Sequence, residues 1–311
     1  MPNNTDEKNT RMKPPDTMGS LVWRRFRRHP GAMAGAVILI ILILSVTLAG
    51  LSPYDPEKSN IVNRFKPPSS SHLFGTDGLG RDVLVRVLYG GRVSLSVGFL
   101  VVAISLSIGV PIGSVAGYFG GWVDSILSKV IDATMSLPAL MFMILLASIL
   151  REIDLPILKS NSRLTISLVL GVLSWPTAAR LVRAIFLTFR EMEYVTAAKA
   201  LGASDLRIII SEILPNGLGP IIVESTLGIG YAIMEESTLS FLGFGIMPPT
   251  PSWGNMLDNA QEHLAQYPWL AIFPGLMIFL TIISINFIGD GLRDALDPYK
   301  ILAQVDEPAK K

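Results

Sequence analysis

Long apolar stretches alternate with shorter polar segments along most of this chain. Six of the apolar stretches reach the roughly 20 residues that a helix needs to cross the hydrocarbon core of a bilayer. They cover residues 31–51, 93–116, 130–150, 164–186, 218–239 and 270–288. This pattern predicts an all-α transmembrane protein with six spanning helices.

Composition and charge narrow the class of protein further. Of the 311 residues, 50% are apolar but only 16% are charged, and the mean hydropathy is +0.48. Soluble domains carry about a quarter charged residues. The net charge of +1 gives no global basic field, which argues against nucleic-acid binding. Cysteine is absent, so disulfides and cysteine-based metal sites are excluded.

The positions of lysine and arginine predict the orientation, because these residues collect on the cytoplasmic side of spanning helices. The segment "WRRFRRHPG" before the first span and the connection at 187–216 are basic, whereas the connection between the fifth and sixth spans has no lysine or arginine. We expect a multi-pass membrane protein with both termini in the cytoplasm. Polar tails at 1–19 and 303–311 are expected to be disordered around a transmembrane domain at 20–302.

The polar connection "EYVTAAKALGASDLRIIISEILPN" (Glu193–Asn216) stands out between two apolar spans. Its first part is alanine-rich, with acidic residues early and Lys199 late, which predicts a helix that complements its own dipole. Gly202 lies where a helix ends on a left-handed residue. Ser204 and Asp205 then predict the start of a second helix.

The second helix is expected to stop near Leu214, because Pro215 disfavours helical geometry in the residue before it. Ala197 and Ala198 are predicted to form a patch of small side chains beside the glycine break. One interpretation is an amphipathic helix lying on lipid. The acidic residues and paired alanines favour the other, a docking element for a cytoplasmic partner.

Three glutamates, Glu224, Glu235 and Glu236, lie in or near the fifth span. Charged residues inside spans usually face the bundle interior or water, so all three are candidates for a translocation path. The alternative is a hydrogen-bonded glutamate that joins two helices, or one near the outer surface. No nucleotide-binding G-x-x-x-x-G-K-[ST] loop, metal-ligand spacing or nucleophile–base constellation occurs.

Several motifs resemble the inner-membrane permease subunits of ATP-binding cassette importers. Ala197, Ala198 and Gly202 match the spacing of that family's Glu-Ala-Ala (EAA) loop, and "EILPN" matches its closing part. Thr196 stands where the loop has glutamate, and one residue is missing before Pro215. Three further segments resemble the C-type permease of dipeptide, oligopeptide and nickel importers: "HLFGTDGLGRDVLVRVLYGGRVSLSVG", "LSFLGFGIMPPTPSWGNML" and "NFIGDGLRDALDP".

The resemblance implies a six-helix type I importer permease of the bacterial or archaeal cytoplasmic membrane, with a cytoplasmic coupling loop at 187–216. The expected ATPase-coupling residues are Glu193, Ala197, Ala198, Lys199, Gly202, Asp205, Ile213 and Pro215. It further implies a second, homologous permease, two cytoplasmic ATPase subunits that bind ATP and Mg²⁺, and an extracytoplasmic substrate-binding protein. Trp253 and Gly254 are candidates for docking that protein, although tryptophan is more often an interface anchor. This chain itself is expected to bind no cofactor or metal and to have no enzymatic activity.

The expected function is to form half of a translocation path for dipeptides or oligopeptides. The same architecture would also suit nickel or another small solute. A different class of function, a proton-coupled secondary transporter using Glu224 or Glu236, predicts an inverted internal repeat. The sequence has no convincing repeat.

Overall fold

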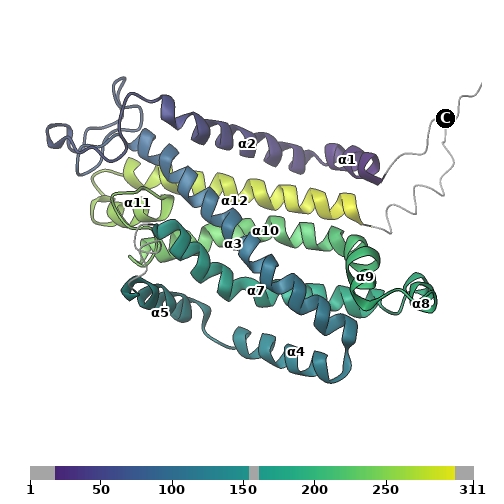
Figure 1. Ribbon diagram of the computed structural model, residues 1–311. Coiled ribbons are helices and arrows are strands. Elements are labelled where there is room, and N and C mark those ends of the chain that lie inside the picture. The colour runs from purple at the N-terminus through teal and green to yellow at the C-terminus, as the bar shows by residue number, and fades with distance from the viewer. Residues whose placement is uncertain (1–17, 154–160, 298–311) are drawn as a thin grey trace, which may run out of the picture.

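The computed structural model describes residues 18–153 and 161–297 (Figure 1). Over these residues the chain is helical, and the only β-pairing is an isolated bridge between Thr76 and Asp82. Five helices are long and apolar enough to cross a membrane, and a bent helix pair brings the number to six. The predicted all-α transmembrane fold is confirmed.

The long helices are α2 (Pro30–Thr47), α3 (Val83–Phe119), α7 (Ser162–Phe189), α10 (Leu214–Phe241) and α12 (Trp269–Leu296). The bent pair consists of α4 (Gly121–Met135) and α5 (Ala139–Glu152). Shorter helices are α1 (Met18–Arg28), α8 (Glu193–Ala200), α9 (Asp205–Arg207) and α11 (Trp253–Ala260). Single turns are η1 (Leu48–Leu51), η2 (Ile61–Asn63) and η4 (Gln261–His263), and η3 (Ile208–Ile213) is a π-helical stretch.

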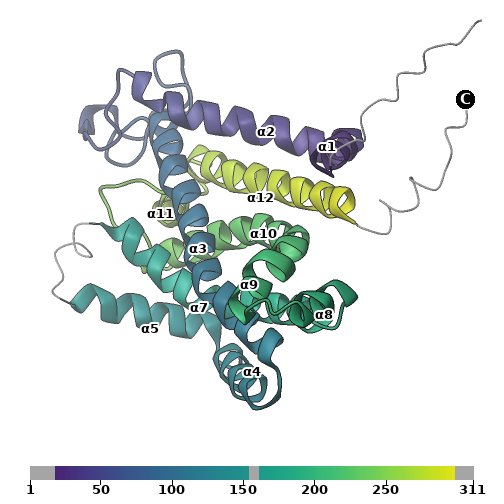
Figure 2. The same ribbon diagram turned by 45° about the vertical axis from the view of Figure 1, so that its right-hand side comes forward.

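The long helices run between two ends of the molecule (Figure 1, Figure 2). One end carries α1, α8 and α9, and is called the α8 end below. The opposite end carries α11 and the segment 52–82, and is called the α11 end. The chain passes between the ends up to six times if the bent pair counts as one crossing.

Helices α3 and α7 pack most closely, along a stripe of small residues. Gly109, Gly113 and Gly117 recur at intervals of four, and a Cβ on any of them would come within 3.0 Å of α7 atoms. The hydrophobic effect does not drive helices together within lipid, so the van der Waals contact allowed by this close approach holds α3 and α7 together. Asp124 of α4 pairs with Arg183 of α7, so α4 is tied to the same helix.

The span expected at 130–150 is not one straight helix. Instead, α4 and α5 meet at an angle of 85°. The break falls at Ser136–Pro138, where Pro138 has φ −62° and ψ 99° and lacks an amide hydrogen for the helix ladder. Because α4 begins at Gly121, the bent pair also starts nine residues earlier than expected (121 against 130).

The stop expected near Leu214 is also wrong, because the helix continues through Pro215 into α10. Leu214 keeps helical angles of φ −58° and ψ −44°. The π-helical stretch before it changes the hydrogen-bond ladder where proline offers no donor, and Asn216 Nδ2 donates to the Glu212 carbonyl at 2.6 Å. The tails expected at 1–19 and 303–311 lie outside the described residues, except for Met18 and Gly19, which begin α1.

Candidate functional site

The loop at the α8 end has the predicted helix–glycine–helix geometry. Helix α8 ends at Ala200, and Gly202 follows with φ +82°. A Cβ at Gly202 would meet no atom within 4 Å, so the need for glycine is one of backbone conformation alone. Ser204 has the extended angles of an N-cap before α9, without a side-chain capping bond.

The inner face of this loop packs on the ends of α3 and α7. Val195, Ile208 and Ile213 are fully buried in a cluster with Val182 and Phe186. Ala198 packs against the same cluster, whereas Ala197 is exposed. The patch predicted at Ala197 and Ala198 is therefore divided between two faces. Ile213, expected to contact an ATPase, cannot do so directly because it is covered by this chain.

Polar contacts fix the loop to the end of α3. The Tyr118 hydroxyl donates to Asp205 Oδ1 at 2.6 Å. Lys199 Nζ lies 5.1 Å from the centroid of the Tyr118 ring, within cation–π range. Lys199 and Asp205, predicted as coupling residues, thus hold the loop in place on both sides of Gly202. Sequence reasoning did not single out Tyr118, because it lies 87 residues from Asp205.

The outer face of the loop presents large apolar side chains. Leu201 is 88% exposed and Leu206 is 67% exposed, and they flank the turn at Gly202. Glu193 and Pro215 are exposed as well. Sequence reasoning did not single out these two leucines. A leucine directly before a helix-ending glycine in a polar segment does indicate an exposed apolar side chain.

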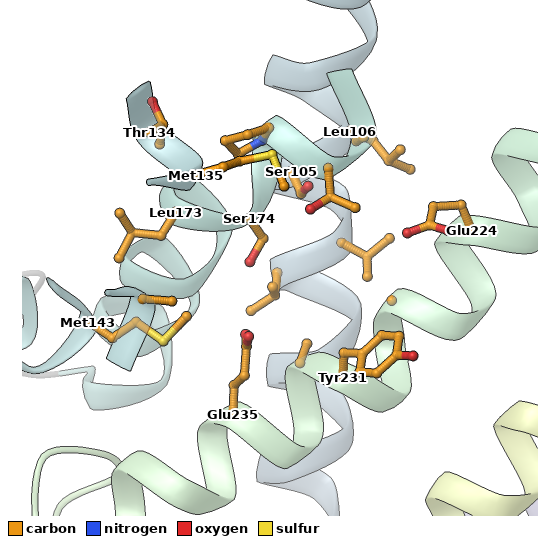
Figure 3. Close-up of a pocket in the computed structure, with 18 of the residues that line it drawn as sticks. Ser105, Leu106, Thr134, Met135, Met143, Leu173, Ser174, Glu224, Tyr231 and Glu235 are labelled. Atoms are coloured by element: carbon orange, nitrogen blue, oxygen red, sulfur yellow. The ribbon is translucent and has the colours of Figure 1, made fainter. Parts of the chain in front are cut away.

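A cavity of about 390 Å³ opens between α3, the α4–α5 bend, α7 and α10 (Figure 3). Its wall is mainly apolar, and includes Leu106, Met135, Met143 and Leu173. Hydroxyl groups come from Ser105, Thr134, Ser174 and Tyr231. The bend at Ser136–Pro138 contributes because residues on both sides of it line the cavity.

Two of the predicted path residues, Glu224 and Glu235, line this cavity. With Gly228 and Tyr231 they occupy one face of α10 at spacings of four, three and four residues. Eleven residues separate them, which is about 16 Å along a helix. Within the described part of the chain, neither carboxylate has a hydrogen-bond or ion-pair partner, and no lysine, arginine or histidine lines the cavity.

Glu236 is not a path residue, and this part of the prediction is wrong. Its side chain is fully buried and turns toward α3, where Ser94 Oγ donates to Oε2 at 2.9 Å. Ser240 Oγ donates to the other oxygen at 2.7 Å. Glu236 is therefore the alternative considered from the sequence, a hydrogen-bonded glutamate that joins two helices.

The docking role expected for Trp253 and Gly254 is wrong as well, since both residues are buried. Trp253 is 0% exposed, and its Nε1 donates to the Val87 carbonyl at 2.9 Å. A Cβ on Gly254 would meet the backbone of Ser237 at 2.6 Å. Helix α11 folds back against α3, α10 and α12, so this segment is part of the core at the α11 end.

Two family descriptions match the chain. "Binding-protein-dependent transport system inner membrane component" matches residues 109–301, and "N-terminal TM domain of oligopeptide transport permease C" matches residues 17–68. The fold is similar to a chain of the MetNI methionine ABC transporter in inward-facing conformations. There the TM-score is 0.55 at 18% identity, over 69% of this chain and 96% of that one.

Relatives of similar length are named as permeases of peptide transport systems. The dipeptide transport system permease protein DppC of Alkalihalophilus pseudofirmus is 41% identical over 89% of this chain and 88% of its own. The protein of the same name from Haemophilus influenzae is 39% identical over 89% and 93%. The oligopeptide transport system permease protein OppC of Bacillus subtilis is 39% identical over 88% and 87%. The chain belongs to the family of binding-protein-dependent transport system inner membrane components, and is a multi-pass permease subunit of an ATP-binding cassette importer.

Proposed function

We propose that this chain forms half of the translocation path for dipeptides or oligopeptides. The observation that carries the proposal is the pair of carboxylates, Glu224 and Glu235, on one face of a mainly apolar cavity, where neither has a partner among the described residues. A peptide brings a protonated amino group that such a carboxylate attracts, and apolar side chains that suit the remaining wall. The names of the relatives, which transport dipeptides and oligopeptides, support the same class of solute.

The α8 end is proposed to face the cytoplasm. Four arginines of α1, Arg24, Arg25, Arg27 and Arg28, lie at this end with the basic residues of the α8–α9 loop. Positive charge of this kind marks the cytoplasmic side of bacterial membrane proteins. Both termini then lie in the cytoplasm, and the α11 end faces the extracytoplasmic binding protein.

The α8–α9 loop is proposed to dock on a cytoplasmic ATPase subunit. Leu201 and Leu206 project two large apolar groups that an apolar groove would bury. ATP and Mg²⁺ would be bound by two such subunits, since this sequence has no phosphate-binding loop. One chain has one loop, so two ATPases call for a second, homologous permease that completes the path.

Motion of the loop would reach the cavity through two rigid connections. One is the unbroken run of α9, η3 and α10, which carries Glu224 and Glu235. The other is the contact of Tyr118 with Asp205, which ties the loop to α3. Closure of the ATPases would move these helices as rigid levers. The cavity would then open alternately to one side of the membrane and to the other.

The test is transport by the complete assembly. The two permeases and two ATPases, reconstituted in proteoliposomes with the binding protein, are expected to hydrolyse ATP faster when a di- or oligopeptide is added and to accumulate the labelled peptide. Accumulation of nickel with no response to peptides would refute the peptide class but keep the architecture. Peptide uptake that follows a proton gradient without ATP would refute the importer mechanism.

A further inference from the structure

A second hollow, of about 310 Å³, lies at the α11 end, away from the translocation cavity. One wall is the segment 64–81 with the first turn of α3, and the other is α11 with η4. Its polar and charged lining consists of Arg64, Asp77, Arg81, Arg86, Asn259 and His263. Neither the transport path nor the coupling loop uses these residues.

Positive charge exceeds negative charge at the floor of this hollow. Arg81 and Arg86 are only 9% and 4% exposed, and they share a single carboxylate. Asp77 Oδ2 lies 2.7 Å from Arg81 Nε and 3.5 Å from Arg86 Nε. Its other oxygen already accepts the backbone N–H groups of Leu79 and Arg81, so Asp77 has little capacity left.

Several guanidinium nitrogens remain without an acceptor. Among the described residues, nothing accepts a hydrogen bond from Arg81 Nη1 or Nη2, or from Arg86 Nη2. Arg86 Nη1 donates to the Pro56 carbonyl at 2.8 Å. None of these nitrogen atoms is fully enclosed by the described residues. Arg64 adds an exposed third guanidinium at the rim, 5.0 Å from the Phe65 ring.

Arginine donors held in a partly enclosed site attract an oxyanion. A guanidinium that loses water without gaining an acceptor is costly, and a carboxylate or phosphate bound by its fork relieves that cost. Glu57 lies close enough to influence Arg86, but it is exposed and does not line the hollow. Counting Asp77 and Glu57 against Arg64, Arg81 and Arg86 leaves an excess of one positive charge.

We infer that this hollow, named the Arg81 pocket, receives an acidic side chain of the extracytoplasmic binding protein. The inference depends on the proposed orientation, which directs the α11 end outward. The arginines lie at the floor, so only a projecting group reaches them. The walls come mostly from the 64–81 segment, α11 and η4, which lie outside the long apolar helices, and this favours a protein partner over a lipid phosphate.

The experiment measures binding of the purified binding protein to the complete transporter in nanodiscs of zwitterionic lipid. Arg81→Gln is expected to raise the Kd about tenfold or more and to weaken its dependence on salt, because a buried charge pair is lost. Asn259→Asp places a competing carboxylate on the pocket wall without removing a buried arginine, and is expected to raise the Kd about fivefold. Lys66→Gln, an exposed charge of the same loop outside the pocket, is the matched control and should change the Kd less than twofold.

Two results would overturn the inference. One is a Kd unchanged by both Arg81→Gln and Asn259→Asp. The other is an effect that arises only when the nanodiscs contain phosphatidylglycerol, which would assign the pocket to a lipid headgroup. If Arg81→Gln fails to assemble, Asn259→Asp decides alone. Failure of the proposed function has a different signature, because the unaltered transporter would then show no peptide-stimulated ATP hydrolysis with the binding protein.

Discussion

Glu235 and Glu236 are neighbours in α10, yet their side chains lie in different surroundings. Glu235 lines the cavity between α3, α7 and α10 with Glu224, and no protein donor contacts it among the described residues. Glu236 is fully buried against α3 and accepts hydrogen bonds from Ser94 and Ser240. Successive residues of a helix point about 100° apart, so one step along α10 separates a group free to meet a solute from one that joins helices.

The α8–α9 loop repeats this contrast on a smaller scale. Val195 and Asp205 contact the rest of the chain, whereas Leu201 and Leu206 extend away from it. In both regions the inward residues hold the geometry and the outward residues remain available to a ligand or partner. Substitutions on the two faces should therefore alter different measurements.

The largest expected effect comes from Glu236→Ala. It removes the acceptor of two buried serine hydroxyls and leaves a small cavity between α3 and α10, at a cost of about 3 kcal/mol. The change should appear as a lower thermal unfolding midpoint of the purified complex. Glu236→Gln retains an acceptor and should unfold close to the parent, as should Glu235→Ala. Equal unfolding midpoints for Glu236→Ala and Glu235→Ala would show that the two glutamates do not differ in their contribution to stability.

A somewhat smaller effect is expected for Leu201→Asp on the α8–α9 loop. Docking would bury a leucine side chain that is 88% exposed, and a carboxylate in its place costs about 2 kcal/mol or more. The affinity for the ATPase subunit, measured by titration into nanodisc-held permease, should fall about 30-fold with the unfolding midpoint unchanged. Leu201→Met keeps the apolar area and should bind normally. Normal ATPase binding by Leu201→Asp would show that the outer face of the loop is not part of the docking surface.

Glu235→Gln should lower peptide uptake about tenfold without lowering stability, because it removes the charge that attracts a peptide's ammonium group while retaining the shape of the side chain. Uptake of an amino-acetylated peptide, which has no ammonium group, is the internal control and should not change. Equal losses for both peptides would indicate that Glu235 shapes the cavity rather than recognising charge.

Much of the architecture could be predicted from the sequence, because a membrane imposes its thickness on every spanning helix. The helix–glycine–helix loop was also predictable, since Gly202 has to adopt a left-handed conformation that few other residues tolerate. The angle at Pro138 was not predictable, because proline within a span permits a range of bends and neighbouring helices select one.

Which site residues face inward and which face outward could be learned only from the tertiary structure. The burial of Trp253 depends on the approach of α11 to Val87, and nothing near Trp253 in the sequence marks α3 as its neighbour. The same holds for Tyr118, which meets Asp205 across a long sequence separation. Apolar runs locate helices, but they do not give the rotation of each helix about its own axis.

The smallest expected effect, from Tyr118→Phe, tests the inner face of the loop directly. Only the hydroxyl is removed, so the hydrogen bond to Asp205 is lost at a cost of about 1 kcal/mol while the ring remains beneath Lys199. ATPase binding should be unchanged, because Leu201 and Leu206 are untouched. The number of peptides transported per ATP hydrolysed should fall about twofold, because α3 follows the loop less tightly. Asp205→Asn keeps an acceptor for the Tyr118 hydroxyl, so the number of peptides transported per ATP should fall less in that variant. A Tyr118→Phe transporter with an unchanged ratio would mean that the unbroken α9–η3–α10 connection carries the motion alone.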